Sequence, residues 1–334
     1  MFGGGVKKAH RFDCDRAVKG LQRSLWGYFK KAVIADRIGI FVSGVLSDEN
    51  AEGFVLLWAM IIYSLQIYAD FSGGIDVIMG ISEILDIRLP ENFKAPLVSK
   101  SVTEYWQRWH ISLGVFMERY LYYPIVLNRR IMRLSKKIPD NYLRKVCPAV
   151  SASAAVFVIV GIWHGTGWNY VVYGCYQAVF VTGAVLLGPC YKKWKKNLHI
   201  DDSCISWRIF QILRTFLILT AGRYFIRADN LSHAAKLLGR TFQKLSWQGI
   251  HVLFDDSLLS YGLDHKNLML MYMGAVLIIL VDVLHERNIH FRELLMKQDI
   301  VFRYAVYYAL LFGIIIFGVY GPGYDSASFI YQGF

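Results

Sequence analysis

The chain has 334 residues, of which 55% are hydrophobic, 15% are aromatic and only 19% are charged. A soluble protein ordinarily carries about 25% charged residues, so this composition disfavours the soluble class. The formal net charge is +12. The basic residues are clustered between apolar stretches instead of along one face, which argues against a nucleic-acid-binding protein and predicts no nucleic-acid partner.

Six long apolar stretches follow one another along the chain. Several of them approach the roughly 20 residues that a helix needs to cross about 30 Å of hydrocarbon. A soluble protein could bury one or two such helices, but it has no interior for six. The sequence therefore predicts an all-α fold, a polytopic transmembrane helical bundle. The stretches are Gly53–Ala69, Cys147–Trp163, Trp168–Leu187, Phe210–Ala221, Leu268–Val283 and Tyr304–Tyr320.

Two domains are expected. Residues 1–31 are polar and basic, resemble no cleavable signal peptide, and predict a basic cytoplasmic arm; residues 32–334 predict a multi-span membrane domain. Basic runs at 129–145 and 192–196 lie in gaps separated by two apolar stretches, so both can face the cytoplasm under the positive-inside rule. The five cysteines lack any Cys-x-x-Cys spacing, which predicts neither a disulfide framework nor a metal site.

The first part of the membrane domain combines apolar and charged residues. Residues 31–46 are short and carry charge, which predicts an interfacial or partial helix. The span Gly53–Ala69 ends at Asp70-Phe71-Ser72-Gly73-Gly74, and we expect an irregular break there that lines a wet cavity. A helix is then expected to resume over Ile75–Leu85.

A second helix is expected after two prolines. Ser101-Val102-Thr103-Glu104 has the pattern of a capping box, and Glu104 can pair with Arg108 at i, i+4. From these residues alone a structural role is favoured for this segment, and its two tryptophans fit an aromatic belt at the membrane surface as well as a binding pocket. The helix is expected to place four residues on one face, namely Trp106, Trp109, His110 and Leu113.

A helical hairpin is predicted next, with helices over Cys147–His164 and Trp168–Leu187 joined by Gly165-Thr166-Gly167. Further along, the alternation of apolar and basic residues over Leu231–Phe242 predicts an amphipathic interfacial helix.

His164 is the sharpest candidate for chemistry. It lies in the last turn of an uncharged apolar helix, and ionisable residues within a span are costly and therefore informative. Gly161 and Gly165 allow another backbone to approach closely. An imidazole can titrate near physiological pH, as a general base must. The residues alone support a packed, hydrogen-bonded histidine equally well.

Five segments carry a further pattern: Tyr68–Asp76, Leu89–Pro96, Glu104–Leu113, Trp163-His164-Gly165 and Phe329-Ile330-Tyr331. Together they resemble the membrane-bound O-acyltransferase (MBOAT) family, in the branch of bacterial alginate O-acetyltransferases and teichoic-acid D-alanyltransferases. The resemblance implies a ring of helices whose tunnel meets a cytoplasmic funnel near the motif histidine. It implies catalytic roles for His164 and His110, and it makes Trp163, Asn169, Trp106 and Asp70 candidate tunnel residues. The N-terminal hydrophobic helices typical of the family are expected to be lacking.

The resemblance also implies a multi-pass protein of the bacterial plasma membrane. It would move an acyl group, most simply acetyl, from a cytoplasmic thioester to a hydroxyl of an extracytoplasmic polysaccharide. Acetyl-CoA or an acyl carrier protein would be a co-substrate, with no tightly bound cofactor and no metal. The expected partners are the lipid bilayer, this donor and a second acyltransferase on the outer face.

Three alternatives stay open. One is D-alanyl transfer from a carrier protein towards teichoic acid. Another is an inactive scaffold. The third is a transporter or channel with a relay of histidines and acids. Transport is disfavoured because the Gly-rich segment at 72–74 has no counterpart later in the chain.

Overall fold

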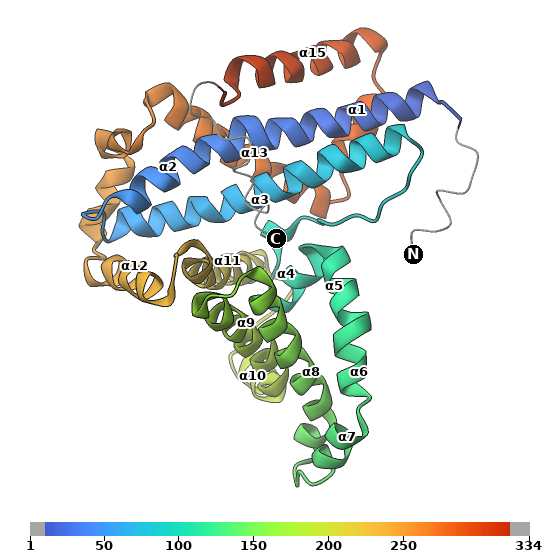
Figure 1. The fold of residues 1–334 in the computed structure, drawn as a ribbon, viewed down its shortest axis with the longest axis vertical. Coiled ribbons are helices and arrows are strands. Elements are labelled where there is room, and N and C mark those ends of the chain that lie inside the picture. The colour runs from blue at the N-terminus through green and yellow to red at the C-terminus, as the bar shows by residue number, and fades with distance from the viewer. Residues whose placement is uncertain (1–10, 321–334) are drawn as a thin grey trace. The chain divides into compact units, whose positions relative to one another are not determined.

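The computed structural model describes residues 11–320, which form helices joined by turns and loops (Figure 1). Residues 1–10 of the predicted arm and the motif Phe329-Ile330-Tyr331 lie outside the described residues. The described chain divides into unit 1, residues 11–95 and 240–320, and unit 2, residues 96–239. Among the described residues, five helices are long and apolar enough to cross a membrane, or six if a bent pair is counted as one span. These findings confirm the predicted all-α membrane bundle.

Unit 1 begins with one long helical rod. It consists of α1 (Cys14–Tyr28), the π-helical segment η1 (Phe29–Ala35) and α2 (Asp36–Ser47). The Asp13 carboxylate caps the rod by accepting a hydrogen bond from the Arg16 amide at 2.8 Å. Helix α1 therefore begins inside the segment predicted as an arm. Residues 31–46, expected as an interfacial or partial helix, belong to η1 and α2 and bury Ile34, Ile38 and Phe41 completely.

Helix α3 (Phe54–Ile84) runs beside this rod (Figure 1). The break predicted at residues 70–74 is wrong, because α3 continues through Gly73 and Gly74. Two glycine pairs explain this. A Cβ on Gly27 would lie 2.5 Å from the Gly73 carbonyl oxygen, and one on Gly20 would lie 2.5 Å from that of Gly80. The glycines therefore let two helix backbones touch, and the helix does not need to break.

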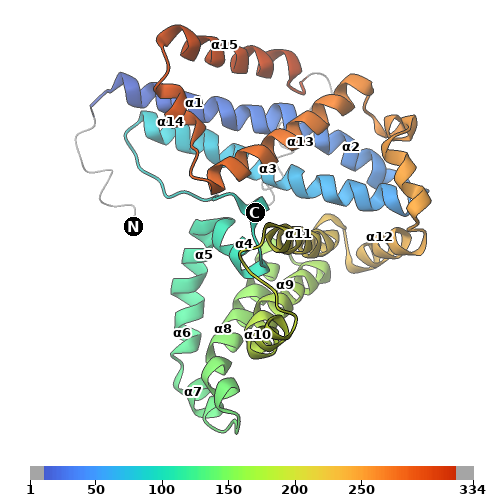
Figure 2. The same ribbon diagram turned by 180° about the vertical axis from the view of Figure 1, so that it is seen from behind.

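The C-terminal half of unit 1 packs on these helices. It contains η4 (Trp247–Leu253), η5 (Asp256–Tyr261), α13 (His265–Glu286), α14 (Phe291–Met296) and α15 (Ile300–Phe317). Both α13 and α15 contact η1, and Figure 2 shows α13 crossing the rod from the other side. The core of unit 1 thus forms around η1.

Unit 2 is organised around the predicted hairpin, formed by α8 (Asn141–His164) and α9 (Trp168–Leu186), which confirms that prediction. A Cβ on Gly161 would lie 2.4 Å from the Tyr170 carbonyl oxygen, so glycine again permits close packing. The other helices are α4 (Val102–Arg108), α5 (Ile111–Met117), α6 (Tyr123–Val126), α7 (Arg129–Ser135), α10 (Gly188–Asn197) and α11 (Ile205–Arg227), with η2 (Pro96–Val98) and η3 (Glu118–Tyr122). Helix α12 (Leu231–Gln243), predicted as amphipathic, crosses the border between the units.

The helix predicted after Ser101 is shorter than expected. Ser101 caps it as predicted, its hydroxyl accepting from the Glu104 amide at 3.1 Å, and Glu104 pairs with Arg108 at 2.6 Å. However, α4 ends at Arg108. His110 takes a left-handed conformation with φ 47° and ψ 54° and starts α5. The prediction of one continuous helix carrying Trp106, Trp109, His110 and Leu113 on a single face is therefore wrong, because the backbone turn at His110 separates two helices.

Candidate active site

Unit 2 brings the two predicted histidines to the same indole. His164 ends α8 and is 7% exposed, and its ring centroid lies 4.9 Å from that of Trp163. His110 lies in the turn between α4 and α5. Its ring centroid is 6.4 Å from that of Trp163, which belongs to α8. On a further side, His164 meets Tyr173 of α9 edge-on at 5.9 Å. Two residues 54 positions apart in the chain thus share one aromatic neighbour.

The local backbone explains how these rings are placed. A left-handed residue other than glycine is uncommon and costs energy, so surrounding packing must hold His110 in place. Its neighbour Trp109 is 5% exposed and stacks on Tyr105 with ring centroids 5.4 Å apart. At the end of α8, a Cβ on Gly165 would lie 2.4 Å from the Tyr170 ring. A side chain at position 165 would therefore displace the Tyr170 ring, and glycine avoids this at the turn that follows His164.

A cavity of about 470 Å³ lies beside His110 within unit 2. Its walls come from α4, α5, η3, α8 and α9, and they are mainly apolar. The residues of the expected helical face all line it despite the helix break. They are Trp106, Trp109, His110 and Leu113. His110 lies outside the long apolar helices, and burial lowers the pKa of its imidazole to about 4, so the ring is neutral at physiological pH.

Two buried side chains behind the cavity wall were not found from the sequence. The Gln177 side-chain oxygen accepts a hydrogen bond from the Trp106 indole at 3.2 Å, and the Arg223 guanidinium donates to the Tyr105 hydroxyl at 3.2 Å. Gln177 is 1% exposed and Arg223 is 6% exposed. The Gln177 Nε2 and Arg223 Nη1 atoms have no hydrogen-bond partner among the described residues. The sequence does contain a signal that could have identified them: Gln177 lies within one apolar stretch and Arg223 closely follows another.

The other candidate tunnel residues lie elsewhere. Asn169, fully buried in the first turn of α9, donates to the carbonyl oxygens of Phe225 and Ala228, each at 2.9 Å, and so ties α9 to the end of α11. It does not line the cavity. Asp70 belongs to α3 in unit 1 and pairs with Lys31 at 2.8 Å. Tunnel roles for these two residues stay predictions.

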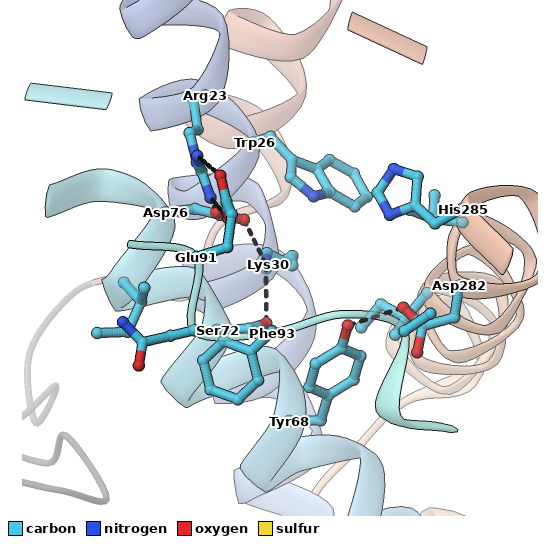
Figure 3. A pocket seen from close by; sticks show the side chains of 15 residues that line it. Arg23, Trp26, Lys30, Tyr68, Ser72, Asp76, Glu91, Phe93, Asp282 and His285 are labelled. Atoms are coloured by element: carbon cyan, nitrogen blue, oxygen red, sulfur yellow. Dashed lines mark hydrogen bonds and ion pairs between the residues drawn. The ribbon is translucent and has the colours of Figure 1, made fainter. Parts of the chain in front are cut away.

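Unit 1 holds a second, smaller pocket of about 100 Å³ lined by ion pairs (Figure 3). Arg23 pairs with Asp76 at 2.8 Å and with both oxygens of Glu91 at 2.6 and 2.7 Å. Lys30 bonds Asp76 at 2.7 Å and the Ser72 hydroxyl at 2.8 Å. These contacts join α1, η1, α3 and the segment after α3. They neutralise charge inside the unit, which is a structural function.

No metal centre is found in the part of the chain that the structure describes: no three His, Cys, Asp or Glu side chains come together as a group that could hold an ion.

The chain is similar in sequence to known proteins. Residues 46–222 match the model of the family described as MBOAT, membrane-bound O-acyltransferase family. The chain is 29% identical over 234 residues to a probable alginate O-acetylase AlgI of Pseudomonas putida, covering 70% of this chain and 43% of that protein.

Two other curated proteins are similar to the chain. A peptidoglycan O-acetyltransferase of Helicobacter pylori is 32% identical over 214 residues, covering 64% of this chain and 36% of that protein. A teichoic acid D-alanyltransferase of Bacillus subtilis is 28% identical over 225 residues, covering 66% of this chain and 53% of that protein. The chain thus spans between about a third and a half of the length of these relatives.

Proposed function

Because the chain belongs to the membrane-bound O-acyltransferase family, we propose that it transfers an acyl group from a thioester to a hydroxyl, with His164 as the general base. The observation that carries the proposal is the meeting of His110 and His164 at the Trp163 indole. His110 also lines the apolar cavity, whereas His164 and Trp163 do not line it. A buried imidazole with aromatic neighbours is a suitable base in a site from which water is excluded.

In the proposed step, His164 accepts the proton of the acceptor hydroxyl while the hydroxyl oxygen attacks the thioester carbonyl carbon. The C–O bond forms, the C–S bond breaks, and the proton passes from the imidazolium to the departing thiolate, which leaves as a thiol. General-base assistance of this kind typically contributes about 10²–10⁴ in rate. The neutral His110 ring, which lines the cavity, is proposed to hydrogen-bond the donor or the acceptor and to hold it in line.

The donor and acceptor are assigned by chemistry and by the relatives' names. We propose a cytoplasmic thioester, acetyl-CoA or an acyl carrier protein, because the basic loops would attract its phosphates or acidic surface. The proposed acceptor is a hydroxyl of an extracytoplasmic polysaccharide, since two relatives are named as acetylating enzymes for alginate and peptidoglycan. The corresponding location is the bacterial plasma membrane, and an acyltransferase on the outer face is a proposed partner.

D-alanyl transfer is the second candidate, favoured by the similarity to teichoic acid D-alanyltransferases of two bacteria. It uses the same bond changes with an aminoacyl thioester. The two candidates differ in donor and acceptor only.

The test uses the full chain reconstituted in bilayer nanodiscs. Radiolabelled acetyl-CoA, acetyl carrier protein and D-alanyl carrier protein are supplied separately, each with polysaccharide or teichoic acid, and transfer of label is measured. We expect His164→Gln to lower transfer by about 10²–10⁴ while the amount of protein in the bilayer stays normal. The matched control is His265→Gln in α13, whose side chain is 74% exposed.

Wild-type transfer in the His164→Gln protein would overturn the catalytic assignment. Transfer of D-alanine alone would select the second candidate, and transfer with none of the three donors in the wild-type chain would contradict the proposed function.

A further inference from the structure

Helix α10 (Gly188–Asn197) leaves the apolar hairpin of unit 2 at a sharp bend of 63° after α9. The preceding α9 has 19 residues, which correspond to about 28 Å at 1.5 Å per residue and nearly cross the hydrocarbon by themselves. Helix α10 adds four lysines and no acidic residue within ten positions. Lysines are costly at bilayer depth, so α10 does not continue the span and must lie at or beyond its end.

One face of α10 is apolar and uncovered within unit 2. Leu187, Tyr191, Trp194 and Leu198 recur at i, i+4, i+7 and i+11, which places them along one side of the helix. Leu187 is 62% exposed, Trp194 is 48% exposed and Leu198 is 54% exposed. The Tyr191 and Trp194 rings stack at 6.0 Å, and both residue types favour the boundary between water and lipid.

The opposite face of α10 is basic. Lys192, Lys193 and Lys196 are exposed, and none of them makes an ion pair among the described residues. Lys195, at the border of the two faces, pairs with Asp202 and lies over the Tyr191 ring at 5.4 Å. Three exposed lysines are therefore available to an anion from outside unit 2.

A second basic element lies at the same end of the hairpin. The Tyr142 hydroxyl, in the first turn of α8, donates to the Val185 carbonyl oxygen near the end of α9, so α7 and α10 both adjoin this end. Residues 129–145 and 192–202 together contain eleven basic residues but only three acidic ones, Asp140, Asp201 and Asp202. The basic residues are Arg129, Arg130, Arg133, Lys136, Lys137, Arg144, Lys145, Lys192, Lys193, Lys195 and Lys196.

We propose that α10 is an interfacial helix that binds anionic phospholipids. Its apolar face enters the boundary between acyl chains and headgroups, and Lys192, Lys193 and Lys196 contact lipid phosphates of the leaflet that adjoins this end. An amphipathic helix with aromatic residues on one face and lysines on the other has the composition of a helix lying in the membrane plane. An acidic carrier protein would use the lysines but would leave the exposed apolar face without a partner. The lipid surface accounts for both faces.

Depth of insertion tests the apolar face. In the full chain with its other cysteines replaced by serine, a spin label is attached at Cys190, which is exposed on α10, or at Trp194→Cys or Lys193→Cys. In nanodiscs, we expect oxygen to relax the labels at 190 and 194 more strongly than a water-soluble nickel complex does, with the reverse at 193. Equal exposure to water at all three positions would overturn the proposal.

Lipid selectivity tests the basic face. Nanodiscs containing phosphatidylcholine with a minor fraction of spin-labelled phosphatidylglycerol report lipid retained at the protein. An anionic surface strengthens binding by about fivefold per nearby lysine, so the triple variant K192Q/K193Q/K196Q is expected to lose most of the preference for phosphatidylglycerol. The matched triple lysine-to-arginine variant keeps the charge and should keep the preference.

Acyl carrier protein supplies the opposing outcome. If the lysine-to-glutamine variant retained its phosphatidylglycerol preference and lost binding of carrier protein, α10 would be a protein-docking surface and the proposal would be wrong. The lipid measurements do not require acyl transfer, so they distinguish failure of this proposal from failure of the proposed function.

Discussion

The two units place polar side chains in apolar surroundings in opposite ways. In unit 1, Lys31 bridges Asp36 and Asp70 at 2.8 Å each, and Lys30 pairs with Asp76, so buried charges are matched by opposite charges. In unit 2, the cavity wall instead carries neutral imidazole and indole rings, supported by Gln177 and Arg223. Unit 1 thus balances buried charges by ion pairs between its helices, while the cavity of unit 2 is bordered mainly by neutral and apolar side chains.

The comparison predicts that replacing a buried polar residue of unit 1 by an apolar one lowers the stability of the fold. The same kind of replacement beside the cavity of unit 2 is predicted to lower activity. The largest effect on stability is expected for Lys31→Met. Asp70 is only 1% exposed, and in this variant its carboxylate stays buried but loses its ion pair with Lys31. Breaking a buried pair in this way costs about 3–5 kcal/mol. The measurement is the midpoint of denaturation in nanodiscs or mild detergent.

Two variants complete that experiment. Lys297→Met removes an exposed lysine of unit 1 and should leave the midpoint unchanged. Adding Asp70→Asn to Lys31→Met removes the more deeply buried of the two carboxylates that lose Lys31 and should restore part of the lost stability. If Lys31→Met unfolded at the wild-type midpoint, the ion pairs of unit 1 would not hold its helices together.

A smaller change in stability is expected for Gln177→Met in unit 2. The variant loses the hydrogen bond to the Trp106 indole, but it also removes a buried amide nitrogen that has no partner. The two effects oppose each other, so the net loss should be under about 1 kcal/mol. The released Trp106 would misplace the cavity wall, and acyl transfer is expected to fall by about 10- to 100-fold.

The measurement for Gln177→Met is a pair of values from one preparation, the denaturation midpoint and the rate of label transfer. A rate that falls only in proportion to the loss of folded protein would remove the distinction between the units.

The sequence predicted those parts of the fold that depend on local signals. The α8–α9 hairpin follows from apolar length and a glycine-rich turn, and the Ser101 cap follows from residues three positions apart. The continuous α3 could not be predicted, because Gly73 and Gly74 weaken a helix locally and the packing against Gly27 that offsets this is not visible in the sequence.

The same limit applies to the candidate site. His164 and His110 were found from motifs, and each lies in a short segment with its own signal. Their meeting at Trp163 depends on how α4, α5 and α8 pack, and Gln177 became visible only as the acceptor for Trp106. Pairing of Lys31 with Asp70, 39 positions apart, is likewise a property of the tertiary structure.

A further expected effect is a dependence of stability on pH that comes from the cavity of unit 2. Burial lowers the pKa of His110 from 6.5 to about 4. Between these values the unfolded chain binds a proton that the folded chain does not bind, so the contribution of His110 is fully present above about pH 6.5 and is lost as the pH falls towards 4.

His110→Asn isolates this contribution, because asparagine tolerates the left-handed conformation and does not titrate. We expect the denaturation midpoint of the wild-type protein to fall more steeply between pH 6.5 and 4.5 than that of His110→Asn. His265→Gln, which removes an exposed imidazole, should follow the wild type. Parallel curves for the wild type and His110→Asn would mean that the imidazole is as well solvated in the folded chain as in the unfolded one. In that case the cavity beside it is open to water, and the contrast with the charged interior of unit 1 would no longer distinguish a site from a scaffold.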